Sequence, residues 1–186
     1  METTDSSCKT VLAGQKTVLR PIVAADLPTI QAWDADPAII ALMGRRFDAQ
    51  QPEEWLRSVR SARTCRAWLV VSPEGQPLGE VELAQINWRA GTAEVRICIG
   101  AKECWGQGIG TDALIISLTY AFETMNLQAI YLRVFATNLR AIRLYERMGF
   151  RKRGLLPPSE RRGDPAPVLL MNLTEHRWAA RRLVTA

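Results

Sequence analysis

Three glycines in alternate positions follow an apolar stretch near the middle of the chain, which reads ICIGAKECWGQGIG from Ile97 to Gly110. A helical pattern begins directly after Gly110, so the segment predicts a strand, a tight loop and the start of a helix. The first N–H groups of a helix have no intrahelical acceptor and lie at the positive end of the helix dipole. Such a junction suits a phosphate or pyrophosphate group.

The glycine spacing matches neither of the common nucleotide-binding motifs. The segment WGQGIG lacks the third-glycine spacing of GxGxxG, and no Gly-Lys-Ser/Thr follows it as in a P-loop. The alternative interpretation is a plain strand-to-helix turn. The loop alone leaves both interpretations open.

A second segment, NLRAIRLYERMGF, predicts a helix with an Asn at its start and a Gly at its end. Asn138 is a favoured N-cap, and Gly149 fits the position just past a helix C-terminus. Tyr145 lies seven residues after Asn138. A phenol with a pKa of about 10 is protonated at neutral pH and is able to donate a proton. The alternative interpretation is a half-buried tyrosine that packs against Ile142.

Two carboxylates are candidates for a general base. Glu82 and Glu94 lie on predicted strands, on the faces opposite the apolar residues, and either is able to accept a proton directly or through water. The alternative interpretation of Glu94 is an ion pair with Arg96 or with a neighbouring strand.

The composition indicates a globular protein of one domain. The chain has 186 residues, of which 47% are hydrophobic and 23% charged. We expect a single domain over residues 1–186, with residues 1–14 weakly ordered. The formal net charge of +5 suits an anionic cofactor. It does not by itself indicate a nucleic-acid partner, because the basic residues are scattered.

Metal sites, disulfides and membrane spans are not expected. The four cysteines show no CxxC spacing and His176 is the only histidine. No apolar run approaches the ~20 residues that span a bilayer. The N-terminus METTDSSCKT is polar and acidic, unlike a secretion signal. We expect a cytoplasmic protein with reduced thiols and no membrane partner.

Strands and helices that would position these residues follow from the apolar periodicity. Strands are expected over 16–21, 67–71, 78–86, 92–99, 129–135, 150–156 and 168–173. Helices are expected over 24–33, 37–43, from 52, from the glycines to 125, over 138–148 and after 174. The strands from 67 to 99 predict an antiparallel meander. The strand–helix–strand order from 92 to 135 predicts a parallel βαβ unit.

In the order and spacing of AEVRICIG, KECWGQGIGTDAL, NLRAIRLYERMGF and VLLMNL, the chain resembles the GCN5-related N-acetyltransferase (GNAT) superfamily, in particular its RimJ/RimL-like branch. The similarity covers about residues 78 to 174. It implies an α+β (mixed α/β) fold. In that fold a central, mostly antiparallel sheet has one splayed parallel strand pair and helices on both faces.

The resemblance implies acetyl-CoA as co-substrate, and no metal is expected from the cysteine and histidine pattern. Trp105 departs from the family pattern, which has Arg or Gln at this position, but the backbone N–H groups of residues 107–111 remain for the pyrophosphate. Backbone groups near Ile97 and Ile99 would pair with pantetheine, and a strand bulge is expected at Cys98 or Gly100. The implied cofactor-binding residues are Ile97, Cys98, Ile99, Trp105, Gly106, Gln107, Gly108, Ile109, Gly110, Thr111, Asn138, Arg140 and Arg143.

The implied activity is N-acetyl transfer by direct attack of a primary amine on the thioester. Tyr145 would protonate the thiolate, a backbone N–H near Ile99 would polarise the carbonyl oxygen, and Glu94 or Glu82 would serve as base. Cys98 and Cys104 are not expected to act as nucleophiles, because no base is placed near them and the family uses direct attack. The alternative is a non-catalytic acyl-CoA-binding or regulatory module on the same fold.

The acceptor is left open among a protein N-terminus, a polyamine, an aminoglycoside and another small amine. Residues 24–64 and 157–167 are expected to shape its site, and Arg161 and Arg162 beside the cleft argue against a polyamine. Possible acidic contacts are Asp34, Asp36, Glu53 and Glu54. The protein is expected to be a monomer or a homodimer.

Overall fold

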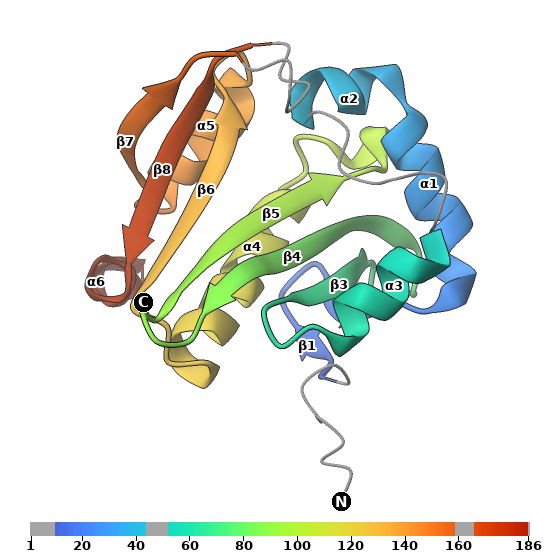
Figure 1. Ribbon diagram of the computed structural model, residues 1–186, viewed down its shortest axis with the longest axis horizontal. Helices are drawn as coiled ribbons and strands as arrows, with labels where there is room; N and C mark the ends of the chain where they lie inside the picture. The colour runs from blue at the N-terminus through green and yellow to red at the C-terminus, as the bar shows by residue number, and fades with distance from the viewer. Residues whose placement is uncertain (1–9, 44–51, 159–165, 186) are drawn as a thin grey trace, which may run out of the picture.

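The computed structural model describes residues 10–43, 52–158 and 166–185, and within them it contains one eight-stranded sheet (Figure 1). The strands lie in the order β1-β2-β3-β4-β5-β6-β8-β7. Their bounds are β1 (Leu12–Ala13), β2 (Val18–Pro21), β3 (Arg66–Val71), β4 (Pro77–Asn87), β5 (Thr92–Ile99), β6 (Ala129–Phe135), β7 (Arg151–Leu156) and β8 (Val168–Thr174).

Helices connect these strands and follow the last of them. They are α1 (Leu27–Ala35), α2 (Pro37–Met43), α3 (Pro52–Ser61), α4 (Ile109–Thr119), α5 (Leu139–Arg147) and α6 (Glu175–Thr185). Shorter turns are the 3-10 turns η2 (Ala24–Asp26) and η3 (Lys102–Cys104) and the π-helical turn η4 (Tyr120–Thr124). Among the described helices, none is long and apolar enough to cross a bilayer.

The predicted mixed fold is confirmed. All neighbouring strands of the sheet pair antiparallel except β5 and β6, which pair parallel and are joined through α4 as a βαβ unit. Strand β8 lies between β6 and β7, an insertion that the strand periodicities did not indicate.

The parallel pair is short, as expected for splayed strands. Only Thr92–Glu94 of β5 pair with Ala129–Tyr131 of β6, and neither strand ends there. Beyond Glu94 and Tyr131 the two strands diverge, and the sheet opens into a V between β5 and β6 (Figure 1).

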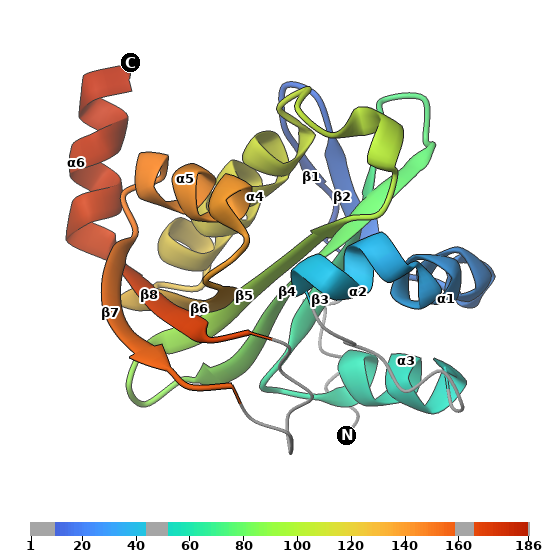
Figure 2. The ribbon, with the colours of Figure 1, turned by 90° about the horizontal axis from the view of Figure 1, so that it is seen from above.

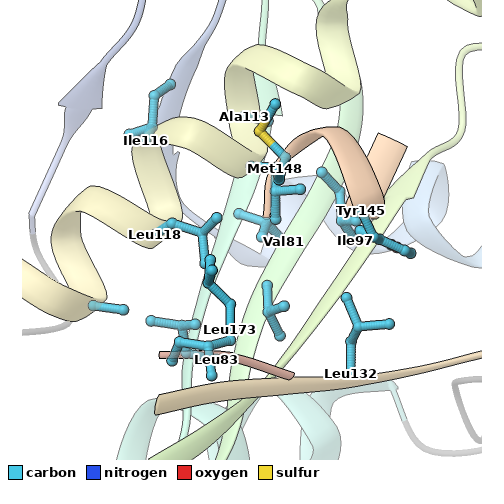
Figure 3. Close-up of a cluster of buried hydrophobic side chains, with 14 of the residues drawn as sticks. Val81, Leu83, Ile97, Ala113, Ile116, Leu118, Leu132, Tyr145, Met148 and Leu173 are labelled. Atoms are coloured by element: carbon cyan, nitrogen blue, oxygen red, sulfur yellow. The ribbon is translucent and has the colours of Figure 1, made fainter. Parts of the chain in front are cut away.

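Two apolar cores hold the helices on opposite faces of the sheet (Figure 2). Leu27 and Ile30 of α1, with Leu56 of α3, pack against Leu69 of β3 on one face. On the other face α4 and α5 pack against the central strands in a larger cluster, of which Figure 3 shows a part. Leu114 and Leu118 of α4 are fully buried in it.

Four local expectations differ from the structure. Residues 12–13 form β1 rather than a frayed end, because they pair with Val18 and Leu19. The helix predicted to reach Met125 is α-helical only to Thr119, and the π-turn η4 continues it. Residues 24–26 form a 3-10 turn rather than the first turn of α1.

The strand bulge is also in a different place. Pairing of β5 with β4 is regular through Cys98 to Ile99, and the register shifts instead between Ala84 and Asn87 of β4. Gln85 there has a φ of 50°. The register shift lies at one end of the β4–β5 pair, and the glycine loop follows the other end.

Candidate active site

Two cavities open from the V between β5 and β6, and they share one wall. We call the first, of about 280 Å³, the glycine-loop cavity and the second, of about 340 Å³, the carboxylate cavity. The shared wall consists of Leu42, Met43, Ile97, Asn138, Ala141 and Tyr145. Ligands in the two cavities would therefore both contact these few side chains.

Most of the residues predicted to hold a phosphate-bearing cofactor meet at the glycine-loop cavity. Those that line it are Ile97, Ile99, Trp105, Gly106, Gly108, Ile109, Gly110, Thr111, Asn138 and Arg140. Cys104 and Arg147 line it as well, and the prediction had assigned neither of them to the cofactor. The remaining three predicted residues, Cys98, Gln107 and Arg143, are not part of its wall.

The glycines give the loop a backbone path that other residues rarely follow. Gly106 and Gly108 have φ angles of 87° and 86°. Helix α4 begins at Ile109 with Gly108 as its N-cap, so the N–H groups of residues 108–111 have no acceptor inside the helix. The N–H of Gln107 does not belong with them, contrary to the prediction, because it donates to the carbonyl of Cys104 at 3.3 Å.

Trp105 connects the loop to the end of β5. Its indole Nε1 donates to the carbonyl of Ile99 at 2.7 Å. The Arg140 guanidinium lies over its ring, 5.5 Å from the centroid. The Ile99 carbonyl, which we expected to be available to pantetheine, is therefore already engaged. This hydrogen bond fixes the position of the glycine loop relative to the end of β5.

Tyr145 lies in the wall between the two cavities. Helix α5 places Tyr145 next to the core, where it is 7% exposed, and its ring packs in an edge-to-face arrangement with Phe150 at a centroid distance of 5.8 Å. Figure 3 shows it at the side of the buried cluster, with Ile97 of β5. The burial of Tyr145 matches the packing interpretation, but the ring contact is with Phe150 and not with the expected Ile142. Tyr145 also lines both cavities.

Asn138 caps α5, as predicted. Its Oδ1 accepts a hydrogen bond from the N–H of Ala141 at 3.1 Å. Its Nδ2 donates to the carbonyl of Leu42 at 3.2 Å. One side chain thus joins the start of α5 to the end of α2.

Glu94 is enclosed by two arginines. It is 2% exposed, and its two oxygens accept hydrogen bonds from Arg133 of β6 at 2.7 and 2.9 Å and from Arg96 at 2.7 and 3.1 Å. Burial would raise the pKa of Glu94, but the hydrogen bonds and charges of Arg133 and Arg96 together hold it below its usual range. The ion-pair interpretation of Glu94 is confirmed by these contacts.

Glu82 has a different environment. In the β4–β5 register it lies opposite Arg96, whose Nη1 is 3.4 Å from its Oε2, a long contact. The Cys65 thiol donates to its Oε1 at 3.1 Å. Burial, and then the charge of Glu82, raise the pKa of Cys65, so this thiol stays protonated as the donor. Glu82 therefore keeps a defined orientation while facing the carboxylate cavity.

The carboxylate cavity includes residues that the sequence did not single out. Glu80 of β4 and Arg133 of β6 line it together with Glu82, Glu94 and Arg96. Alternation along β4 and β5 was a usable signal for Glu80, since it shares a face with Glu82. Nothing local marked Arg133, which reaches Glu94 across the V.

Among the four possible acidic contacts, Asp34 alone lines either cavity. Asp36 is instead paired with Lys102, while Glu53 and Glu54 are exposed on α3. Leu42 and Met43 of α2 and Trp55 of α3, which belong to the 24–64 segment, also line the carboxylate cavity. Arg161, Arg162 and most of the 157–167 loop lie outside the described residues.

In the part of the chain that the structure describes, no group of three or more His, Cys, Asp or Glu side chains is arranged to hold a metal ion. The remaining predicted residues lie away from the cavities: Arg143 is exposed on α5, and Cys98 is buried in the sheet.

Residues 16–151 match a protein-family model described as an acetyltransferase (GNAT) domain. The match contains the splayed strands, the glycine loop and the helix that carries Tyr145. This chain therefore belongs to the GNAT acetyltransferase family.

Individual relatives are similar over parts of their length. The chain is 38% identical over 87 residues to the spermidine N(1)-acetyltransferase of Escherichia coli, a stretch that is 47% of this chain and 46% of the relative. An uncharacterized protein of Methanocaldococcus jannaschii is 26% identical over 149 residues, which are 78% of this chain and 30% of that protein. The chain thus spans less than half the length of these two relatives.

A crystal structure of spermidine N-acetyltransferase from Vibrio cholerae in complex with CoA and spermine has the same fold. It superposes with a TM-score of 0.79 at 26% identity and covers 88% of this chain and 98% of that one.

Proposed function

We propose that this protein is an N-acetyltransferase that moves the acetyl group of acetyl-CoA to a primary amine. The observation that carries the proposal is the position of Tyr145 in the wall between a glycine-lined cavity and a carboxylate-lined one. Family membership supports the same assignment. CoA would occupy the glycine-loop cavity, and the amine would occupy the carboxylate cavity.

The glycine-loop cavity has features that suit CoA. Backbone N–H groups at the start of α4 would bind the pyrophosphate. A side chain on Gly106 or Gly108 would strain the left-handed backbone there. The divergence of β5 from β6 beyond Glu94 leaves backbone groups near Ile97 for pantetheine, in the manner of an added strand. Arg140 and Asn138 complete the proposed set, and Arg143, which is exposed, remains a prediction.

In the proposed reaction the amine nitrogen attacks the thioester carbonyl carbon. A new C–N bond forms, the C–S bond breaks, and the leaving thiolate takes a proton. Tyr145 is the proposed donor of that proton. A backbone N–H near Ile99 is the proposed partner of the carbonyl oxygen.

Glu82 is the proposed base that takes the proton from the amine, directly or through water. Glu94 was the other candidate, but a carboxylate with four hydrogen bonds from two guanidinium groups and a lowered pKa is a poor proton acceptor. We assign Glu94 instead to the spacing of β5 and β6.

A small cationic amine is the proposed acceptor. The carboxylates Asp34, Glu80, Glu82 and Glu94 line the cavity together with the guanidinium groups of Arg96 and Arg133, so acidic groups outnumber basic ones. The names of the relatives from Escherichia coli and Vibrio cholerae support a polyamine in particular. A polyamine differs from our expectation based on Arg161 and Arg162, which lie outside the described residues.

Further parts of the proposal rest on the sequence. We place the chain in the RimJ/RimL-like branch, as a single cytoplasmic domain over residues 1–186 that acts without a metal, as a monomer or homodimer. We propose no nucleic-acid or membrane partner.

An acetyl-transfer assay tests this proposal. Release of the CoA thiol is followed with acetyl-CoA and a panel of spermidine, spermine, an aminoglycoside and peptides with free N-termini. We expect turnover with the polycationic amines and little with an acidic peptide. Binding of CoA without turnover on any amine would favour the non-catalytic module instead.

A further inference from the structure

The carboxylate of Asp112 links the segment between β1 and β2 to the first turn of α4. It accepts hydrogen bonds from the N–H groups of Gln15, Lys16 and Thr17 at 3.1, 3.0 and 2.9 Å, and from the Thr17 hydroxyl at 2.8 Å. Gly14 is needed beside it, because a Cβ there would lie 2.4 Å from Asp112 Oδ2. The position of residue 16 is thus defined by a residue almost a hundred positions later.

This connection places Lys16 on the glycine loop. Its Nζ donates to the carbonyl of Gln107 at 2.8 Å. It also lies 3.2 Å from the position that a Cβ on Gly108 would take. The ammonium group is therefore next to Gly108, the N-cap of α4, and Gly108 lines the glycine-loop cavity.

Arg140 approaches the same loop from α5. It stacks over Trp105, and its Nη2 lies 3.8 Å from where a Cβ on Gly106 would be. Two cations from different elements therefore flank a helix N-terminus. The N-terminal end of a helix carries partial positive charge and favours anions, so the two cations do not stabilise α4 by themselves. The arrangement is favourable once an anion lies between them.

We infer that Lys16, which Asp112 holds beside the glycine loop, binds the pyrophosphate of CoA together with the N–H groups of residues 108–111. This inference rests on the proposed use of CoA as co-substrate. The pyrophosphate is the part of CoA with two adjacent anionic groups that backbone N–H groups at a helix start accommodate. Lys16 adds to it a charge-assisted hydrogen bond.

A purely structural role for Lys16 predicts a different pattern of ligand affinities. The Lys16–Gln107 hydrogen bond alone would hold the loop, and its loss would weaken binding of every part of CoA. Ligands that lack the nucleotide or the 3′-phosphate distinguish the two roles. Pantetheine lacks the pyrophosphate, and dephospho-CoA retains it but lacks the 3′-phosphate.

The experiment compares wild-type protein with Lys16→Gln, Lys16→Arg and the control Lys152→Gln. Lys152 is an exposed lysine of β7 that pairs with Glu146 at 3.1 Å. Dissociation constants of CoA and dephospho-CoA are measured by calorimetry, and that of pantetheine by chemical-shift titration. Thermal melts check that each variant is folded.

We expect Lys16→Gln to raise the Kd of CoA and of dephospho-CoA about tenfold, the effect of one charge-assisted hydrogen bond, and to leave that of pantetheine unchanged. Lys16→Arg should retain most of the affinity, and Lys152→Gln should match the wild type.

An unchanged Kd of CoA in Lys16→Gln, or an equal loss of affinity for pantetheine, would overturn the inference. An effect confined to CoA would overturn the assignment to the pyrophosphate. Wild-type protein that bound CoA but transferred no acetyl group would overturn the proposed function alone.

Discussion

Arg133 of β6 donates a hydrogen bond to each carboxylate oxygen of Glu94 of β5, at 2.7 and 2.9 Å. This contact lies at the point where the two strands stop pairing. Glu94 is the last residue of β5 in register with β6, opposite Tyr131. The ion pair therefore ties the strands together at the point of the V, while beyond it they separate. The ion pair thus marks the point from which the V between β5 and β6 opens.

Removal of Arg133 should destabilise the fold. Arg133→Met leaves the buried Glu94 carboxylate with Arg96 alone, so we expect the free energy of unfolding to fall by about 2 kcal/mol. Urea denaturation measures it. The double variant Glu94→Gln/Arg133→Met should lose less free energy of unfolding than the two single variants together. The reason is that the double variant contains no buried Glu94 carboxylate that has lost a guanidinium partner. Strict additivity would contradict this account of the pair.

The lowered pKa of Asp112 predicts a loss of stability in acid. Burial alone would raise this pKa, but the N–H groups of residues 15–17 and the Thr17 hydroxyl lower it overall. A carboxyl with a lower pKa in the folded than in the unfolded state stabilises the fold above its unfolded pKa of about 4. That stabilisation disappears as the pH falls through the folded pKa.

Urea denaturation at several values between pH 7 and pH 3 tests this. The free energy of unfolding of the wild type should fall with pH, and Asp112→Asn should be less stable at pH 7 but fall less steeply. The same slope in both proteins would exclude Asp112 as a source of the pH dependence.

The elements of this fold were largely readable from the sequence, because apolar periodicity, caps and turns are local signals. The meander of β3–β5, the βαβ unit and the N-cap Asn138 were predicted in this way. The relationships between distant residues were not. Neither the bonds of Asp112 to residues 15–17 nor the Arg133–Glu94 pair has a local pattern, since each depends on how the whole sheet brings its strands together.

Glu82 and Glu94 should respond differently to the same substitution. Glu82→Gln removes the proposed base and should lower kcat about 100-fold with little change in the melting temperature. Glu94→Gln removes the partner of two arginines and should lower the melting temperature by several degrees. Thiol-release kinetics and thermal melts distinguish them. A normal kcat in Glu82→Gln would exclude Glu82 as the base.

Trp105 should contribute to cofactor affinity through the loop that it fixes. Trp105→Phe keeps a ring under Arg140 but removes the donor to the Ile99 carbonyl. The loss of this hydrogen bond should raise the KM for acetyl-CoA about threefold to tenfold. Trp88→Phe is a matched control, because Trp88 also donates to a carbonyl, that of Arg63, but lines neither cavity. Equal effects of both substitutions would argue against a special role for Trp105.

The most direct test of the account is Tyr145→Phe, which removes the proposed proton donor but keeps the ring that packs on Phe150. We expect kcat for acetyl transfer to fall about 100-fold or more, while the Kd of CoA stays within about twofold of the wild type. A kcat equal to that of the wild type, with CoA binding intact, would contradict the assignment of Tyr145 as the acid.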